Sequence, residues 1–231
     1  MIAKEGINVN NNMFPDAMAA QIGNCGVIAV LIIDRAEDAV PVARALMEGG
    51  VSAMELTLRT PAAMDALRAV AENLPEMLAG AGTVITPAQV KEVFEAGADF
   101  AVSAGMNRRV VEEAGRLGLP FAPGVATPSD IEQALEFGCR LLKFFPAEAG
   151  GGLAYLKSMA APYAHLGLKF IPLGGLDAGN MKAYLQEPIV QCIGGSWLAP
   201  RELIRQRRWD AIRRNAAAAA AIVRELKEAA S

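Results

Sequence analysis

A lysine within an apolar segment has the most unusual chemistry in this sequence. Lys143 lies in LLKFFP, where the alternation of side chains along a strand puts it on one face with Phe145, and Leu142 and Phe144 on the other. Lysine is rarely buried without a partner. Burial favours the neutral amine, which is the form that attacks a carbonyl carbon. Lys143 is therefore a candidate nucleophile for a Schiff base.

A carboxylate and a guanidinium share one face of a second segment, AMELTLRT. Alternation places Glu55, Thr57 and Arg59 together, opposite three apolar side chains that must face a helix layer. Charged groups that point inward are costly unless they pair or serve a ligand. Two interpretations stay open from spacing alone: Glu55 and Lys143 form a structural ion pair, or Glu55 carries protons for a reaction at Lys143.

Glycine pairs end the last two apolar segments, IPLGGLDAGN and QCIGGSWLAP. The pair Gly174 and Gly175, and Gly195 with the neighbouring Ser196, would let backbone N–H groups and a hydroxyl approach an anion. The alternative is two tight turns that need positive φ angles. In GAGTV, Thr83 adds a hydroxyl at the end of another apolar segment, although by itself it indicates only a turn.

The composition excludes several classes of function. The chain has 231 residues, 53% of them hydrophobic and 20% charged, with a net charge of -3, so it lacks the basic surface of a nucleic-acid-binding protein. It contains neither an apolar segment long enough to span a membrane nor the apolar core of a secretory signal. One histidine, His165, and three scattered cysteines do not form a metal motif. We expect a cytoplasmic protein that needs no metal and no cofactor.

Short apolar segments alternate with helical patterns at a spacing of about 20–30 residues, which indicates βα units and a parallel sheet. The predicted strands are Val27–Ile33, Ala53–Leu58, Met77–Ala81, Phe100–Ser103, Pro120–Phe121 onward, Leu141–Phe145, Lys169–Leu173 and Gln191–Gly194. The predicted helices are Met13–Gly23, Ala36–Glu48, Pro61–Asn73, Pro87–Ala96, Arg108–Leu117, Pro128–Phe137, Leu153–Ala160, Asn180–Gln186 and Trp209–Ala230.

Three of the helices follow a Thr-Pro pair, which is the expected order of an N-cap and a first helical residue: Thr60-Pro61, Thr86-Pro87 and Thr127-Pro128. Eight strands that are each followed by a helix predict an α/β protein with a single-domain (β/α)8 TIM barrel. We assign the barrel to residues 13–231, with an extra N-terminal helix and a long C-terminal helix, and a flexible tail to residues 1–12.

These segments together resemble the 2-keto-3-deoxy-6-phosphogluconate (KDPG) / 4-hydroxy-2-oxoglutarate (KHG) aldolases. The resemblance rests on GGVSAMELTLRT, AGAGTV, KFFPAEAGGG, the PxGG turn and CIGGSW, in order over most of the chain. It implies a class I aldolase, homotrimeric and metal-independent, that cleaves a 2-keto acid to pyruvate and an aldehyde. The aldehyde would be glyceraldehyde 3-phosphate or glyoxylate, and the enzyme would act in Entner-Doudoroff carbohydrate metabolism.

The resemblance also implies roles for individual residues. Lys143 would form the Schiff base, and Glu55 would move protons. Arg59 and Thr83 would bind the pyruvyl carboxylate, while Phe145 would form a wall of the site. Four further residues would line the phosphate end: Gly174, Gly175, Gly195 and Ser196.

The sequence departs from the family pattern where the aldehyde half would bind. Leu173 stands where many relatives have threonine, and Ile32 where some have arginine. An aldolase for the galactonate epimer or for another 2-keto acid is therefore an alternative. A phosphosugar isomerase or epimerase on the same barrel, which would not need Lys143, and a binding module without turnover are more distant ones.

Overall fold

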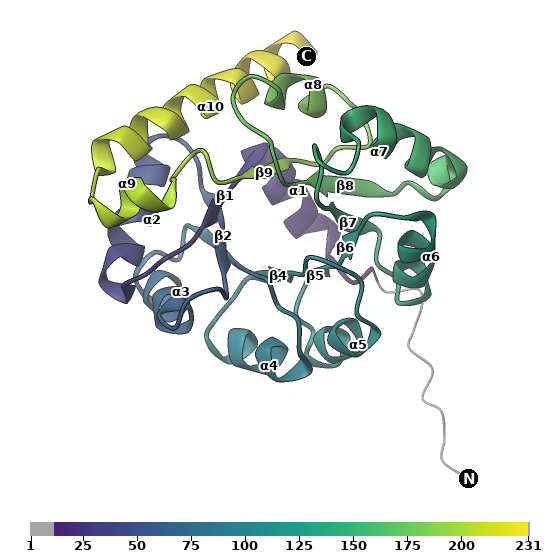
Figure 1. Ribbon diagram of the computed structural model, residues 1–231, viewed down its shortest axis with the longest axis horizontal. Helices are drawn as coiled ribbons and strands as arrows, with labels where there is room; N and C mark the ends of the chain where they lie inside the picture. The colour runs from purple at the N-terminus through teal and green to yellow at the C-terminus, as the bar shows by residue number, and fades with distance from the viewer. Residues whose placement is uncertain (1–11, 231) are drawn as a thin grey trace.

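The computed structural model describes residues 12–230, so the predicted tail, apart from residue 12, lies outside the described residues. The strands are parallel and curl into a ring that helices surround (Figure 1). Their bounds are β1 Val27–Leu31, β2 Ala53–Thr57, β3 Leu78–Gly82, β4 Phe100–Val102, β5 Phe121–Ala122, β6 Gly124–Val125, β7 Leu141–Phe144, β8 Lys169–Pro172 and β9 Ile193–Gly195. The α/β fold with a curled parallel sheet is confirmed.

Hydrogen bonding divides the ring into a sheet of order β5-β4-β3-β2-β1-β9 and a sheet of order β6-β7-β8. The fifth predicted strand is split at Pro123, which has no N–H to donate. Its first half pairs with β4 and its second half with β7. On the other side, a single bridge between Leu173 and Gly194 connects β8 to β9. The strands therefore follow one another around the ring.

Helices follow most of the strands, as expected. The longer helices are α1 Asp16–Cys25, α2 Ala39–Glu48, α3 Ala63–Asn73, α4 Pro87–Glu95, α5 Arg108–Leu117, α6 Pro128–Glu136, α7 Gly152–Ala160 and α10 Trp209–Ala230. Four short helices complete them: η1 Ala36–Asp38, η2 Ala161–Leu166, α8 Met181–Leu185 and α9 Arg201–Arg205. We did not predict α9, because five residues are too few to show a helical period. No helix within residues 12–230 is long and apolar enough to cross a membrane.

The Thr-Pro rule holds for two helices and is wrong for the third. Thr86 and Thr127 cap α4 and α6 in capping boxes, with proline at the start of each helix. Thr60 does not cap α3, which begins at Ala63. Its hydroxyl instead donates to the backbone carbonyl of Ile33, just beyond β1. A tertiary contact has replaced the local cap at this position.

Apolar side chains fill both sides of the ring. The larger core lies between the strands and the outer helices and includes Met54 and Leu56, the outward face of β2. A second core fills the inside of the ring, where Phe14 and Ile22 pack among side chains of the strands. Helix α1, purple in Figure 1, lies across the centre of the ring and brings Ile22 to this core.

Candidate active site

A cavity of about 180 Å³ lies where the carboxyl ends of the strands meet. All nine residues that the sequence indicated as a site line it: Glu55, Arg59, Thr83, Lys143, Phe145, Gly174, Gly175, Gly195 and Ser196. A larger cavity, of about 560 Å³, lies between the N-terminal end of α1 and α5. Neither Lys143 nor Glu55, nor any other buried charged side chain of the described residues, lines the larger one. The smaller cavity is therefore the candidate active site.

A buried ion pair spans the ring at this cavity. Lys143 of β7 donates from Nζ to both carboxylate oxygens of Glu55 of β2, at 2.9 and 3.2 Å. Their side chains are only 7% and 3% exposed. Gly82 at the end of β3 makes room for the carboxylate, since a Cβ there would lie 1.9 Å from Glu55 Oε1. The glycine in AGAGTV thus serves the position of Glu55.

The pair has the chemical capacity for proton transfer. Among the described residues, the only hydrogen-bond partner recorded for the Lys143 amine is Glu55, and the ring centre of Phe145 lies 5.6 Å from Nζ. Transfer of one proton from the ammonium to the carboxylate, across the 2.9 Å contact, would yield a neutral amine beside a carboxylic acid. A nucleophile next to a proton carrier is the arrangement that attack on a carbonyl needs.

Two more predicted residues stand beside this pair. Arg59 follows β2, and its Nε donates to the Thr57 hydroxyl at 3.2 Å. In the part of the chain that the structure describes, Arg59 forms no ion pair, so its charge is available to an anion. Thr83 follows β3 with a φ of 62°, a left-handed conformation that costs a non-glycine residue about 1–2 kcal/mol. Strain of this kind often accompanies a functional position.

The two glycine pairs differ from each other. Gly174 and Gly175 have φ angles of 100° and 83°, so the tight-turn interpretation is correct for them. Gly194 and Gly195 belong to β9 and have no positive φ, so that interpretation is wrong for the second pair. Gly195 instead leaves space for Trp197, because a Cβ at position 195 would lie 1.7 Å from the Trp197 ring. Both pairs leave backbone without side chains at the cavity, as an anion site requires.

The structure adds residues to the cavity that were not predicted as site residues. Thr57 is 2% exposed and lines the cavity between Glu55 and Arg59. Alternation had already placed Thr57 on this face, so the signal was present. Five other lining residues are glycine or apolar: Val30, Ala104, Leu173, Leu176 and Gly194. Of these, Leu173 and Gly194 lie in the two segments that the glycine pairs had indicated. No group of three or more His, Cys, Asp or Glu side chains that could hold a metal occurs within residues 12–230.

Comparison with known proteins gives consistent matches. The sequence model of the family "KDPG and KHG aldolase" matches residues 18–215. The "KHG/KDPG aldolase" of Escherichia coli strain K12 is 42% identical over 186 residues, which cover 80% of this chain and 86% of that protein. The "2-dehydro-3-deoxy-phosphogluconate aldolase" of Dickeya dadantii is 42% identical over 84% of this chain and 91% of its own length.

A solved structure matches both the fold and the sequence. The KDPG aldolase of Legionella pneumophila, captured with pyruvate as a covalent carbinolamine intermediate, superposes with a TM-score of 0.82 at 40% identity. The match covers 87% of this chain and 97% of that one. Its carbinolamine is the species that an amine forms with the keto group of pyruvate.

Proposed function

The chain belongs to the KDPG and KHG aldolase family, and from this premise we propose that Lys143 and Glu55 are its catalytic pair. The protein is a Schiff-base class I aldolase, a carbon–carbon lyase. We assign it the cleavage of KDPG to pyruvate and glyceraldehyde 3-phosphate, of 4-hydroxy-2-oxoglutarate to pyruvate and glyoxylate, or of both. The observation that carries the assignment is the buried Lys143–Glu55 contact of 2.9 Å at the wall of the cavity.

The reaction begins with proton transfer within this pair. The neutral amine of Lys143 attacks C2 of the keto acid, and the protonated Glu55 donates the proton with which the carbinolamine loses water. The resulting iminium withdraws electrons as the C3–C4 bond breaks. Glu55 takes the proton of the C4 hydroxyl, so the aldehyde leaves and an enamine remains. Protonation at C3 and hydrolysis by water release pyruvate and regenerate Lys143.

The remaining predicted residues bind the two ends of the substrate in this proposal. Arg59 contacts the carboxylate with its planar guanidinium, and Thr83 adds a hydroxyl donor. Phe145 covers the iminium side of the cavity, in keeping with its ring at 5.6 Å from Lys143 Nζ. The aldehyde end, phosphorylated in KDPG, lies against the backbone of the two glycine pairs and the Ser196 hydroxyl.

The wider assignments rest on the resemblance to the family. We propose that residues 13–231 form one (β/α)8 barrel with an extra helix at each end, that the enzyme is a cytoplasmic homotrimer, and that it acts in Entner-Doudoroff carbohydrate metabolism. The chemistry requires no metal or other cofactor, because the iminium itself is the electron sink. Sedimentation equilibrium of the purified protein tests the trimer.

Borohydride reduction in the presence of pyruvate tests the catalytic assignment. We expect a three-carbon adduct on Lys143, identified by mass spectrometry of peptides. The Lys143→Ala variant should bind no pyruvate covalently and lose at least about a thousandfold in kcat. Unmodified Lys143 after reduction, or full activity of Lys143→Ala, would overturn the proposal and favour an isomerase or epimerase. Assays with KDPG, its galactonate epimer and 4-hydroxy-2-oxoglutarate then define the aldehyde half.

A further inference from the structure

The segment that carries Arg59 is tied to the end of β1 by two threonine hydroxyls. Thr57, the last residue of β2, donates to the carbonyl of Leu31 at 2.8 Å. Thr60, one residue beyond Arg59, donates to the carbonyl of Ile33. These two bonds therefore restrict the motion of the loop between them relative to β1.

Only one of these hydroxyls reaches the arginine side chain. Thr57 Oγ1 accepts from Arg59 Nε at 3.2 Å while it donates to Leu31. A hydroxyl has a single hydrogen, and here that hydrogen is committed to the backbone carbonyl, so its lone pairs are left to face the guanidinium. Because Thr57 is 2% exposed, water does not compete well for either bond.

The contact at Nε has a consequence for the rest of the guanidinium. Arg59 is an exposed side chain with many rotamers, and ordering it on a ligand would cost free energy. A bond at Nε fixes the plane of the group before the ligand arrives and leaves its two terminal nitrogens, four N–H donors, for a carboxylate. Preorganisation of this kind raises affinity by removing part of the ordering cost.

We propose that Thr57 is a positioning residue that holds Arg59 ready for the carboxylate of the 2-keto acid. The proposal rests on the proposed role of Arg59. Thr57 does not take part in the chemistry at Lys143, so its loss should weaken substrate binding far more than it slows turnover.

The test measures pyruvate binding directly. The concentration of pyruvate that gives half-maximal borohydride inactivation is compared for wild type, Thr57→Val and Thr57→Ser, together with KM and kcat for cleavage. We expect Thr57→Val to raise the half-saturating concentration and KM about tenfold, the size of one lost hydrogen bond to a charged group. kcat should change less than about threefold, and Thr57→Ser, which keeps the hydroxyl, should restore binding.

Thr60→Val is the matched control for a loss of folding. It removes the same kind of bond to the same end of β1, yet Thr60 makes no recorded hydrogen bond with Arg59 among the described residues. Both valine variants should lower the unfolding temperature, but only Thr57→Val should raise the half-saturating concentration. Equal effects of the two on binding would show a structural role and overturn the proposal.

A double-mutant cycle with Arg59→Ala tests the role of Thr57 and the role of Arg59 separately. If Thr57 acts through Arg59, Thr57→Val has no further effect on pyruvate binding once Arg59 is alanine. Additive effects would overturn the role of Thr57 and leave that of Arg59 intact. An Arg59→Ala variant that binds pyruvate normally would overturn the proposed role of Arg59 itself, and with it this inference.

Discussion

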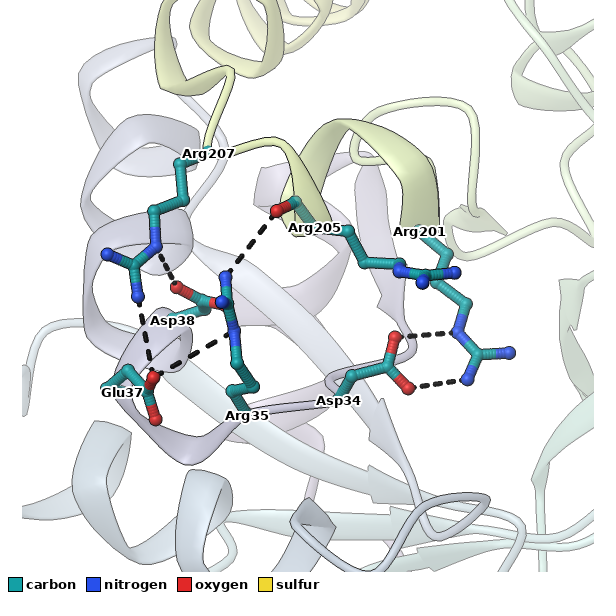
Figure 2. Close-up of polar contacts among 7 residues, drawn as sticks. All are labelled: Asp34, Arg35, Glu37, Asp38, Arg201, Arg205 and Arg207. Atoms are coloured by element: carbon teal, nitrogen blue, oxygen red, sulfur yellow. Dashed lines mark hydrogen bonds and ion pairs between the residues drawn. The ribbon is translucent and has the colours of Figure 1, made fainter.

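Two carboxylates in this protein are equally buried and yet differ in everything around them. Glu55 and Asp38 are each 2% exposed. Asp38 accepts from Arg35 at 2.8 Å and from Arg207 at 2.9 Å, in a network that joins the segment after β1 to α9 and the turn that follows it (Figure 2). The two arginine side chains are 45% and 52% exposed. The partner of Glu55, in contrast, is Lys143, whose side chain is only 7% exposed.

The difference lies in where the positive charge resides. Around Asp38 the cations remain in contact with water, so only one ion has lost its solvation. At Glu55 both ions are desolvated, which costs several kcal/mol per ion unless geometry and partners offset it. Asp38 does not line the cavity, whereas Glu55 and Lys143 do. Burial of a carboxylate alone therefore does not identify a catalytic residue. What distinguishes Glu55 is a buried cation at the wall of the cavity.

The largest effect expected from this comparison is on turnover. Glu55→Gln keeps the size of the side chain and an acceptor for Lys143, but it removes the proton carrier. We expect kcat to fall about 10²–10⁴-fold, the usual contribution of general acid–base catalysis. The variant should stay folded, because the amide oxygen still accepts a hydrogen bond from the Lys143 amine. Steady-state kinetics and circular dichroism measure the two properties.

A Glu55→Gln variant with wild-type kcat would make Glu55 a purely structural partner of Lys143. The two carboxylates would then be equivalent, and the ion-pair interpretation that the sequence left open would be correct. Slow borohydride trapping of pyruvate by a folded Glu55→Gln protein would place the defect at the formation of the Schiff base.

The corresponding change from acid to amide at the second carboxylate should lower stability and leave turnover nearly unchanged. Asp38→Asn removes the charge that Arg35 and Arg207 share, and we expect the free energy of unfolding to fall by about 1–3 kcal/mol. kcat per folded molecule should stay within about twofold of wild type, because Asp38 does not line the cavity. Urea denaturation and kinetics test this together. A large loss of kcat in a folded Asp38→Asn protein would contradict the comparison.

The sequence predicted the fold well where a pattern was long or local. Alternation in AMELTLRT placed Glu55 and Arg59 correctly, and Thr86 and Thr127 capped their helices as expected. It failed where a distant contact decided the outcome. Thr60 bonds to Ile33 instead of capping α3, and the strand at Phe121 divides at Pro123 between two neighbours.

The site was predictable to a similar degree. The burial of Lys143 could be predicted from its neighbours, and so could its partner Glu55, 88 residues away. Spacing left open whether Glu55 is a structural ion-pair partner or a proton carrier. The resemblance to a family supplied the roles of Thr83 and Ser196. Alternation placed Thr57 on the same face, but neither spacing nor resemblance indicated its hydrogen bonds to the Leu31 carbonyl and from Arg59. The Asp38 network involves residues about 170 positions apart and gave no local signal.

The smallest expected effect concerns a third carboxylate, Asp34, which lies near the Asp38 network and forms a separate pair. Asp34 accepts two hydrogen bonds from Arg201 of α9 (Figure 2). The hydrogen bond from Arg201, with the charges of Arg201, Arg205 and Arg35, lowers the pKa of Asp34 below its usual value of 3.8. A lowered pKa stabilises the fold at a pH above 3.8, and this contribution is lost as the pH falls through the lowered pKa.

Asp34→Asn should therefore lower the unfolding temperature slightly at neutral pH, and the difference from wild type should disappear in acid. Because Arg201 is exposed to solvent and Asp34 is partly exposed, salt should weaken the effect as well. Arg201→Gln is the matched control, since it removes the same pair from the other side. The arginines at Asp34 and Asp38 are about equally exposed, but the Asp34 side chain is 29% exposed and that of Asp38 only 3%. A loss at Asp34 as large as that at Asp38 would therefore mean that burial of the carboxylate does not set the strength of these pairs.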